Sequence, residues 1–234
     1  MRRFVVGITG ASGISLGLKF MRYLAEFGGG EVFLVLSDGA KMVADYEKSD
    51  CVKSDFGKRD SGKRDCAKRD SGKKDSGKKD SGKSDSGKKD SSKSDCAKNG
   101  DEVLENVSVF SDSALYAPIS SGSFGVESTF IIPCSANSLA KIACGISDTL
   151  ITRAALVALK ERKNLLLAPR EMPLNSIMLQ NMLTLSNLGA IIAPPMLSYY
   201  ANAENLEAME DFMCGKWLDC VGIRHNLFPR WGEK

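Results

Sequence analysis

The sequence contains a single histidine, His225, among its 234 residues, and this scarcity argues against several kinds of active site. A Ser-His-Asp triad needs a histidine base beside its nucleophile, and a two-histidine metal site needs a second ring. The seven cysteines include no Cys-x-x-Cys pair, which argues against a zinc ribbon and a disulfide scaffold. We therefore expect no metal site and no histidine-based catalysis.

Long apolar runs are also absent. No stretch approaches the roughly 18 consecutive apolar residues of a transmembrane helix, so we expect no membrane span. Met1 to Arg3 lead into a glycine-containing apolar stretch rather than into the hydrophobic region of a signal peptide. Together with the modest cysteine content, this predicts a cytoplasmic protein with reduced thiols.

The net charge of +3 originates in one segment. Between Lys48 and Asp101 there are 17 Lys and Arg residues and 11 Asp residues, whereas the rest of the chain carries 15 basic and 18 acidic residues. The sequence pI of about 8.4 therefore describes this segment rather than the folded body.

Residues 48–99 repeat a five-residue unit, Ser-Gly-Lys-(Lys/Arg)-Asp, with Val52 and Phe56 as the few larger apolar side chains. A period of five matches neither a helix nor a strand, and so polar a segment cannot bury enough apolar surface to become ordered. We predict a disordered insertion within a single domain that is formed by residues 1–47 and 100–234.

The repeat allows two interpretations. It is either a low-complexity expansion without a selected role, which we favour, or an electrostatic arm for nucleic acid or acidic surfaces. Lys and Asp nearly cancel along the repeat, and no aromatic side chains are interleaved for base stacking. We therefore do not expect a nucleic-acid partner.

Outside the repeat, short apolar runs alternate with amphipathic stretches, which predicts a doubly wound, Rossmann-like α/β fold with a mostly parallel sheet covered on both faces. Ligands of such folds bind beyond the carboxyl ends of the strands. The expected strands are 4–8, 31–36, 107–110, 130–133, 164–168 and 190–193, and the expected helices are 16–27, 40–47, 136–143, 149–162, 174–187 and 204–221.

The first strand ends in Gly-Ile-Thr-Gly-Ala-Ser-Gly at 7–13 and runs directly into a helix. Glycines permit a tight turn, and a helix N-terminus offers free N–H groups and a positive dipole to a phosphate. This predicts a nucleotide or phosphate site, the alternative being a plain glycine-rich turn. The motif also resembles that of short-chain dehydrogenases, with Asp38 as a possible ribose ligand, but the Tyr-x-x-x-Lys pair of those enzymes is absent.

Polar clusters follow several other predicted strands. Residues 133–138 open a helix and offer a second place for an anion or a ring. Arg170 and Glu171 place a guanidinium, which suits phosphate, beside a carboxylate that can relay a proton. Arg153 and Lys160 lie two helical turns apart, either at a site or in a solvated basic stripe.

Six motifs, read in order, carry a resemblance that covers nearly all of 1–47 and 103–234. They are GITGASG at 7–13, SSGSF at 120–124, IIPCS at 131–135, LITRAALVALKERKNLLLAPREMPL at 150–174, NMLTLSNLGAIIAPP at 181–195 and PRWGE at 229–233. Together they resemble the flavin prenyltransferase family (UbiX/Pad type), formerly described as aromatic-acid decarboxylases.

The resemblance implies a homo-oligomer, a dodecamer by family analogy, with FMN at subunit interfaces. The family joins a dimethylallyl group from dimethylallyl phosphate or diphosphate to N5 and C6 of reduced FMN, without a metal. The prenylated flavin then serves a UbiD-type decarboxylase.

The resemblance also assigns roles to residues. Glu171 would perform acid–base work, supported by Ser12 and Glu47. The dimethylallyl phosphate would lie among Lys160, Arg170, Tyr200 and Lys216. FMN would be held by Gly10, Ala11, Ser12, Ser37, Ser135, Ala136, Asn137, Ser138 and Arg153.

Two departures from the family pattern affect the expected site. Lys216 stands where the family often has arginine, so the charge is kept but the bidentate fork is lost. The repeat begins directly after Glu47 and would emerge beside the active site.

Two other functions remain open. One is an FMN-dependent decarboxylase of peptidyl or pantothenoyl cysteine, a class that depends on a catalytic histidine, for which His225 is badly placed. The other is a non-catalytic FMN-binding regulatory subunit that uses the basic repeat to engage acidic partners.

Overall fold

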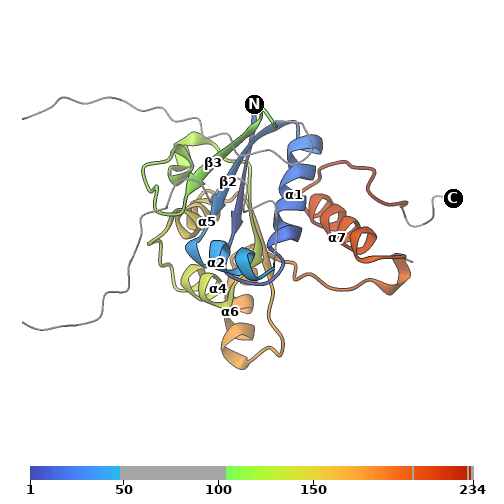
Figure 1. Cartoon of the computed structure of the whole chain (residues 1–234). Coiled ribbons are helices and arrows are strands. Elements are labelled where there is room, and N and C mark those ends of the chain that lie inside the picture. The colour runs from blue at the N-terminus through green and yellow to red at the C-terminus, as the bar shows by residue number, and fades with distance from the viewer. Residues whose placement is uncertain (48–103, 202, 231, 233–234) are drawn as a thin grey trace, which may run out of the picture.

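Six parallel strands form one sheet in the order β3-β2-β1-β4-β5-β6, so the strand order reverses between β1 and β4. The computed structural model describes residues 1–47, 104–201, 203–230 and 232 (Figure 1). The strands are β1 (Arg2–Ile8), β2 (Gly30–Leu36), β3 (Val107–Ser111), β4 (Ser128–Cys134), β5 (Asn164–Pro169) and β6 (Ile191–Ile192).

Helices cover both faces of this sheet, as Figure 1 shows. They are α1 (Ile14–Phe27), α2 (Asp38–Tyr46), α4 (Ala136–Ala143), α5 (Leu150–Lys160), α6 (Ser176–Asn187) and α7 (Leu206–Cys220). Three short 3-10 helices lie at Pro118–Ser120, Gly122–Phe124 and Tyr199–Ala201. The predicted doubly wound fold is thus confirmed. The predicted insertion at 48–99 lies outside the described residues, so the division into 1–47 and 100–234 stays a prediction.

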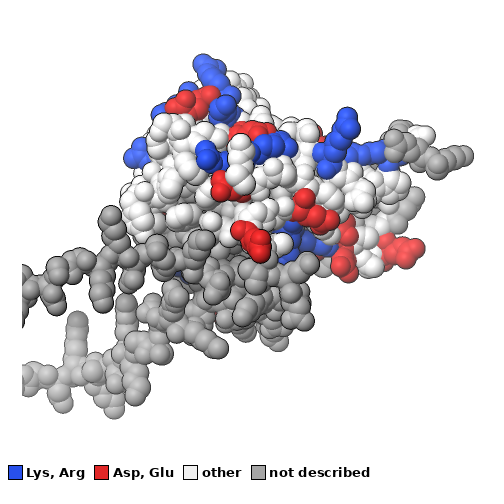
Figure 2. Space-filling model, turned by 90° about the horizontal axis from the view of Figure 1, so that it is seen from above, with Lys and Arg blue, Asp and Glu red and all other residues white. Residues whose placement is uncertain are grey.

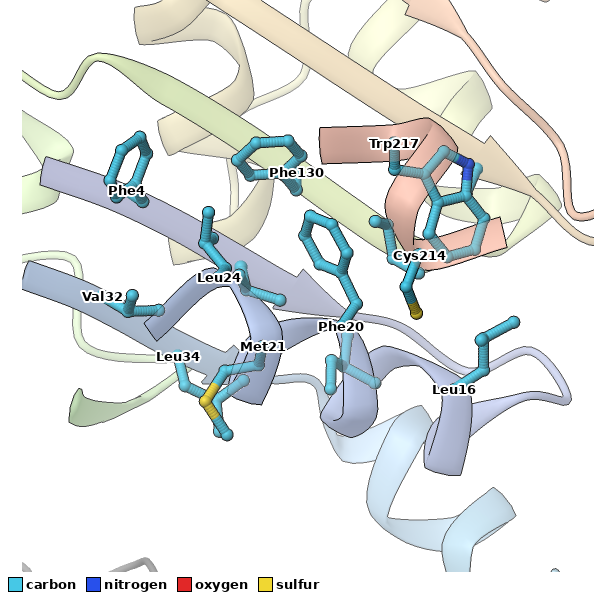
Figure 3. Packing of buried hydrophobic residues seen from close by; sticks show 14 of the residues in the cluster. Phe4, Leu16, Phe20, Met21, Leu24, Val32, Leu34, Phe130, Cys214 and Trp217 are labelled. Atoms are coloured by element: carbon cyan, nitrogen blue, oxygen red, sulfur yellow. The ribbon is translucent and has the colours of Figure 1, made fainter. Parts of the chain in front are cut away.

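The alternation of side chains along the strands separates the core into two layers. Phe4, Val6 and Ile8 of β1 pack with α1, α2 and α7, whereas Val5 belongs to the cluster beneath α4, α5 and α6. At the centre of the first layer, the Phe20 ring lies 4.9 Å from that of Phe130 and 5.8 Å from that of Trp217, centroid to centroid (Figure 3). Since α1 and α4 cover opposite faces, the chain leaves β1 and β4 in opposite directions.

The amino-terminal edge of the sheet carries intermixed charges. Figure 2 views this edge, and among the described residues seen there basic and acidic side chains are intermixed. Arg2 pairs with Glu127 at 2.6 Å, and Arg3 pairs with Glu31 at 3.2 Å. Among the helices that the structure describes, none has the length and hydrophobicity needed to cross a bilayer.

Candidate active site

A cavity of about 500 Å³ opens at the carboxyl edge of the sheet, where the strand order reverses. The loops that follow β1, β2, β4 and β5 converge on it, as expected for a doubly wound fold. It brings together nine of the predicted site residues, namely Gly10, Ala11, Ser37, Ser135, Ala136, Asn137, Ser138, Arg170 and Glu171.

The loops after β1 and β2 meet through two glycines. A Cβ at Gly10 would lie 3.0 Å from the Cα and the carbonyl carbon of Gly39, a tight contact that would push the two loops apart by a few tenths of an ångström. Both glycines line the cavity. The backbone at these two glycines therefore forms part of the cavity floor, where a flat or anionic ligand can approach it closely.

Two predicted cofactor serines cap helices beside the cavity. The Ser37 hydroxyl accepts a hydrogen bond from the Ala40 N–H at 3.1 Å, at the start of α2. The Ser135 hydroxyl accepts one from the Ser138 N–H at 3.2 Å, at the start of α4, and donates to the Ser138 hydroxyl at 3.1 Å. The N-termini of both helices thus face the cavity with serine hydroxyls and N–H groups, a donor set suited to an anion.

The N-terminus of α1 differs from what the sequence predicted. The Glu47 carboxylate accepts hydrogen bonds from the N–H groups of Gly13, at 2.7 Å, and Ile14, at 3.0 Å. The expectation that the N–H groups at this helix start are free to bind a phosphate is therefore wrong, because they already donate to a carboxylate of the same chain. Glu47 does not line the cavity, and neither does the exposed Ser12, which follows the cavity-lining Ala11.

Arg170 and Glu171 lie at the mouth of the cavity, after β5, and both are exposed. The Arg170 N–H donates to the Cys134 carbonyl at 3.2 Å, which ties this segment to β4. The Glu171 carboxylate accepts from the Met172 N–H at 3.2 Å. A guanidinium and a carboxylate therefore share one rim, where the first can hold an anion and the second can take up a proton.

The other predicted residues lie apart from this cavity. Arg153 is exposed in the first turn of α5. Lys160 ends the same helix, about 15 Å along its axis from Leu150 at 1.5 Å per residue, and pairs with Glu161 at 2.8 Å. Since α5 runs from the carboxyl edge to the amino edge, Lys160 lies at the end opposite Glu171.

Lys216 lines a second cavity, of about 290 Å³, between α7 and the segment after β6. Its apolar lining includes Met196, Phe212 and Trp217. The backbone of Tyr200 lies in the 3-10 helix Tyr199–Ala201, but its side chain is outside the described residues.

Several cavity residues escaped the sequence analysis. Asp112 follows β3 and accepts from the Leu150 N–H through its carbonyl, at 2.8 Å, and from the Ile151 N–H through Oδ1, at 2.9 Å. Lys141 lines the cavity and pairs with Asp148 at 2.6 Å. Asp112 could have been found, because it stands two residues after the predicted strand 107–110, whereas Lys141 sits within a helix and gave no signal. The remaining residues of this kind are Gly39, Thr149, Ile151 and Thr152, and Asp38, which was considered as a ribose ligand, also lines the cavity.

His225 is remote from this chemistry. Its side chain is fully buried, accepts from the Leu227 N–H at Nδ1 and lies 3.2 Å from Asp219 at Nε2. Within the described part of the chain, no three His, Cys, Asp or Glu residues are grouped as a metal site would require.

The family model described as Flavoprotein matches residues 1–218. The flavin prenyltransferase UbiX of Helicobacter pylori is 39% identical over 231 residues, which covers 98% of both chains. The chain belongs to the flavin prenyltransferase family. A second family member, UbiX of Thermoplasma acidophilum, is 36% identical over 98% of this chain and 99% of its own.

Solved structures of flavin prenyltransferases have the same fold. AnUbiX in complex with FMN and dimethylallyl pyrophosphate gives a TM-score of 0.73 at 31% identity, covering 100% of this chain and 98% of that one. A dodecameric FMN-dependent UbiX-like decarboxylase from Escherichia coli O157:H7 gives 0.71 at 30% identity, with 98% of each chain covered. The FMN-dependent cysteine decarboxylase TvaF, at 15% identity and a TM-score of 0.50, shares the fold alone.

The residues around the cavity fit FMN. A volume of about 500 Å³ lies within the range of cofactor sites, roughly 300–1,000 Å³. The backbone of Gly10 and Gly39 forms part of its lining, and the serine-capped starts of α2 and α4 offer hydrogen-bond donors.

Proposed function

We propose that the chain transfers a dimethylallyl group from dimethylallyl phosphate or diphosphate to N5 and C6 of reduced FMN. The observation that carries this proposal is the cavity at the β1–β4 reversal, which joins the Ser135–Ser138 loop to Arg170 and Glu171. Bound reduced FMN supplies the nucleophilic positions. The remaining chemistry, departure of a phosphate and movement of a proton, falls to side chains of the chain itself.

We assign these two tasks to neighbouring residues. The Arg170 guanidinium binds the leaving phosphate and stabilises its developing charge. The Glu171 carboxyl group, held in place by the bond from the Met172 N–H, would take up the proton that the flavin carbon loses when it is alkylated and would deliver one to the dimethylallyl double bond. Ser12 and Glu47 support the loop that carries Gly10 and Ala11.

The flavin itself lies along the floor of the cavity in this proposal. Its contacts come from the glycine-rich loop after β1, from Ser37 and from the loop after β4. Arg153 adds a cation near the start of α5. The full set is Gly10, Ala11, Ser12, Ser37, Ser135, Ala136, Asn137, Ser138 and Arg153.

The remaining donor-binding residues come from other copies of the chain. Lys160 and Glu171 stand at opposite ends of α5 and the sheet, so one copy alone does not bring them together. We propose that the chain forms a homo-oligomer, and a UbiX-like relative is dodecameric. In the proposed assembly, Lys160, Tyr200 and Lys216 of other copies complete the phosphate site around Arg170.

The product is expected to serve a UbiD-type decarboxylase in the cytoplasm. The first expectation is tested by asking whether such an enzyme co-purifies with the chain and receives the prenylated flavin from it. Cell fractionation tests the second.

The reaction is tested by incubating the protein anaerobically with reduced FMN and dimethylallyl phosphate. The molecular mass of the extracted flavin is then measured by mass spectrometry. A gain of one five-carbon unit is expected from the wild type and from Glu26→Gln, a matched change at an exposed glutamate of α1. Glu171→Gln should retain FMN and lose at least about 100-fold in rate, the usual contribution of a general acid or base.

Bound FMN without any mass gain, with either the phosphate or the diphosphate, would overturn the proposal. It would point instead to a flavin-binding subunit without catalysis.

A further inference from the structure

Thr9 joins the two central strands beyond the point where their pairing ends. The ladder between β1 and β4 runs from Phe4–Ser128 to Gly7–Ile131. Two residues further on, the Thr9 N–H donates to the Pro133 carbonyl at 3.2 Å. Its hydroxyl donates to the same carbonyl at 2.9 Å and accepts from the Ser135 N–H at 2.7 Å.

Burial makes these side-chain bonds consequential. Thr9 is 1% exposed, and a buried hydroxyl without partners is costly. The hydroxyl is used here in both directions, as donor and as acceptor. Valine has nearly the same shape but would leave the Ser135 N–H without this acceptor, so the effect of the change would come from the lost bonds rather than from a cavity.

The two loops that Thr9 connects both line the cavity. Gly10 and Ala11 directly follow Thr9, and Ser135 begins the loop 135–138. Their helices, α1 and α4, leave for opposite faces of the sheet and belong to different core clusters. The Ser135 side chain is already engaged in capping α4, so its backbone N–H is the group through which Thr9 holds this loop.

We propose that Thr9 is a positioning residue for the flavin: its hydroxyl fixes the separation of the loops 10–12 and 135–138, between which the cofactor binds. This rests on the proposed function insofar as the ligand is FMN. Thr9 does not line the cavity and acts through Ser135 and Gly10.

The test compares Thr9→Val with Thr9→Ser, which keeps the hydroxyl. Ser128→Ala is the control, because Ser128 is equally buried, lies on β4 at the opposite edge and accepts one bond, from Asn164 at 3.2 Å. FMN affinity is measured by quenching of flavin fluorescence, and thermal unfolding is measured for each variant. Thr9→Val should raise the dissociation constant by about tenfold, equivalent to 1.4 kcal/mol. Thr9→Ser and Ser128→Ala should bind like the wild type.

Equal affinity of folded Thr9→Val and wild type would overturn the inference, and so would a loss in Thr9→Ser as large as in Thr9→Val. Hydrogen exchange tests the bond between the Ser135 amide and Thr9 in the absence of flavin. The Ser135 amide should exchange slowly in the wild type and faster in Thr9→Val, whereas an unprotected Ser135 amide in the wild type would refute the role of Thr9. Failure of the wild type to bind FMN would count against the proposed function alone.

Discussion

The Glu47 carboxylate, at the end of α2, receives the N–H groups of Gly13 and Ile14, at the start of α1. Two helices that flank the cavity are joined in this way. The Glu47 carboxylate compensates the positive end of the α1 dipole. In the proposed function, the serine-capped starts of α2 and α4 are therefore the helix ends left to bind a flavin phosphate.

We expect Glu47→Ala to lower the free energy of unfolding by about 1–2 kcal/mol, because two N–H groups lose their acceptor and the dipole loses its counter-charge. Glu47→Gln keeps one acceptor oxygen and should lose less. Urea unfolding followed by circular dichroism gives both values. Glu26→Ala, at an exposed position of α1, is the control. A Glu47→Ala protein as stable as this control would contradict the capping role.

The separation of Lys160 from Glu171 predicts complementation between inactive variants. Lys160→Ala and Glu171→Gln should each be inactive alone. When the two chains are co-expressed in equal amounts, about one quarter of the sites drawn from two copies would contain both native residues. Prenylation should reappear at roughly that level.

The control for complementation pairs Arg170→Ala with Glu171→Gln. These residues line one cavity of the same chain, so mixing the variants should restore nothing. Two results would contradict a site shared between copies: prenylation in this control, or no prenylation when the Lys160→Ala and Glu171→Gln chains assemble together.

The exposed apolar surface of α6 predicts association. Met178 and Leu185 are the buried residues of this helix, whereas Ile177 is 70% and Leu183 54% exposed. Apolar patches of this kind mark interfaces between proteins. The double change Ile177→Glu and Leu183→Glu should reduce the molar mass measured by light scattering. Gln180→Glu adds charge to the same helix and should not, and an unchanged mass in the double variant would rule out this surface.

Cys134 and Cys144 should differ in reactivity. Burial raises the pKa of the Cys134 thiol to about 12, whereas Cys144 is free and exposed. Iodoacetamide at about pH 8 should therefore modify Cys144 in the folded protein and Cys134 only after unfolding in urea, because the thiolate is the reactive form. Peptide mass spectrometry reads both sites, and early modification of Cys134 would contradict its burial.

The same shift gives a pH dependence. The unfolded thiol ionises near its ordinary pKa of 9.0, while the folded thiol stays neutral to about 12. The contribution of Cys134 to stability is therefore complete below pH 9 and is lost as the pH rises toward 12. Thermal unfolding should show a shallower alkaline decline in Cys134→Ala than in the wild type. An identical decline in both would contradict this.

The fold was predictable because its signals are local. Apolar runs and glycine-rich or serine-containing ends located all six strands, and strand ends together with the family resemblance supplied the nine site residues that line one cavity. Strand β6 proved shorter than predicted, two residues rather than four, because the Ala190 N–H donates to the Leu185 carbonyl at the end of α6 and Pro194 and Pro195 follow Ala193 without an N–H for a ladder.

What the sequence did not reveal depends on long-range geometry. The role of Glu47 as a partner of α1 joins positions 34 residues apart, which no periodicity records. Lys160 lies on the expected helix, but its placement at the opposite edge follows from the direction of α5. Thr9 lies within the glycine-rich motif, and its contribution could not be predicted because it consists of hydrogen bonds to another strand.

The brevity of β6 has a consequence for how copies of this chain can meet. Only Leu166–Ile191 and Leu167–Ile192 pair at this border of the sheet, so a further strand would find almost no backbone template there. The β6 edge of the sheet is therefore poorly suited to open-ended, edge-to-edge aggregation. In the proposed homo-oligomer, contacts between copies would instead come from side-chain surfaces such as that of α6, which can form a closed assembly.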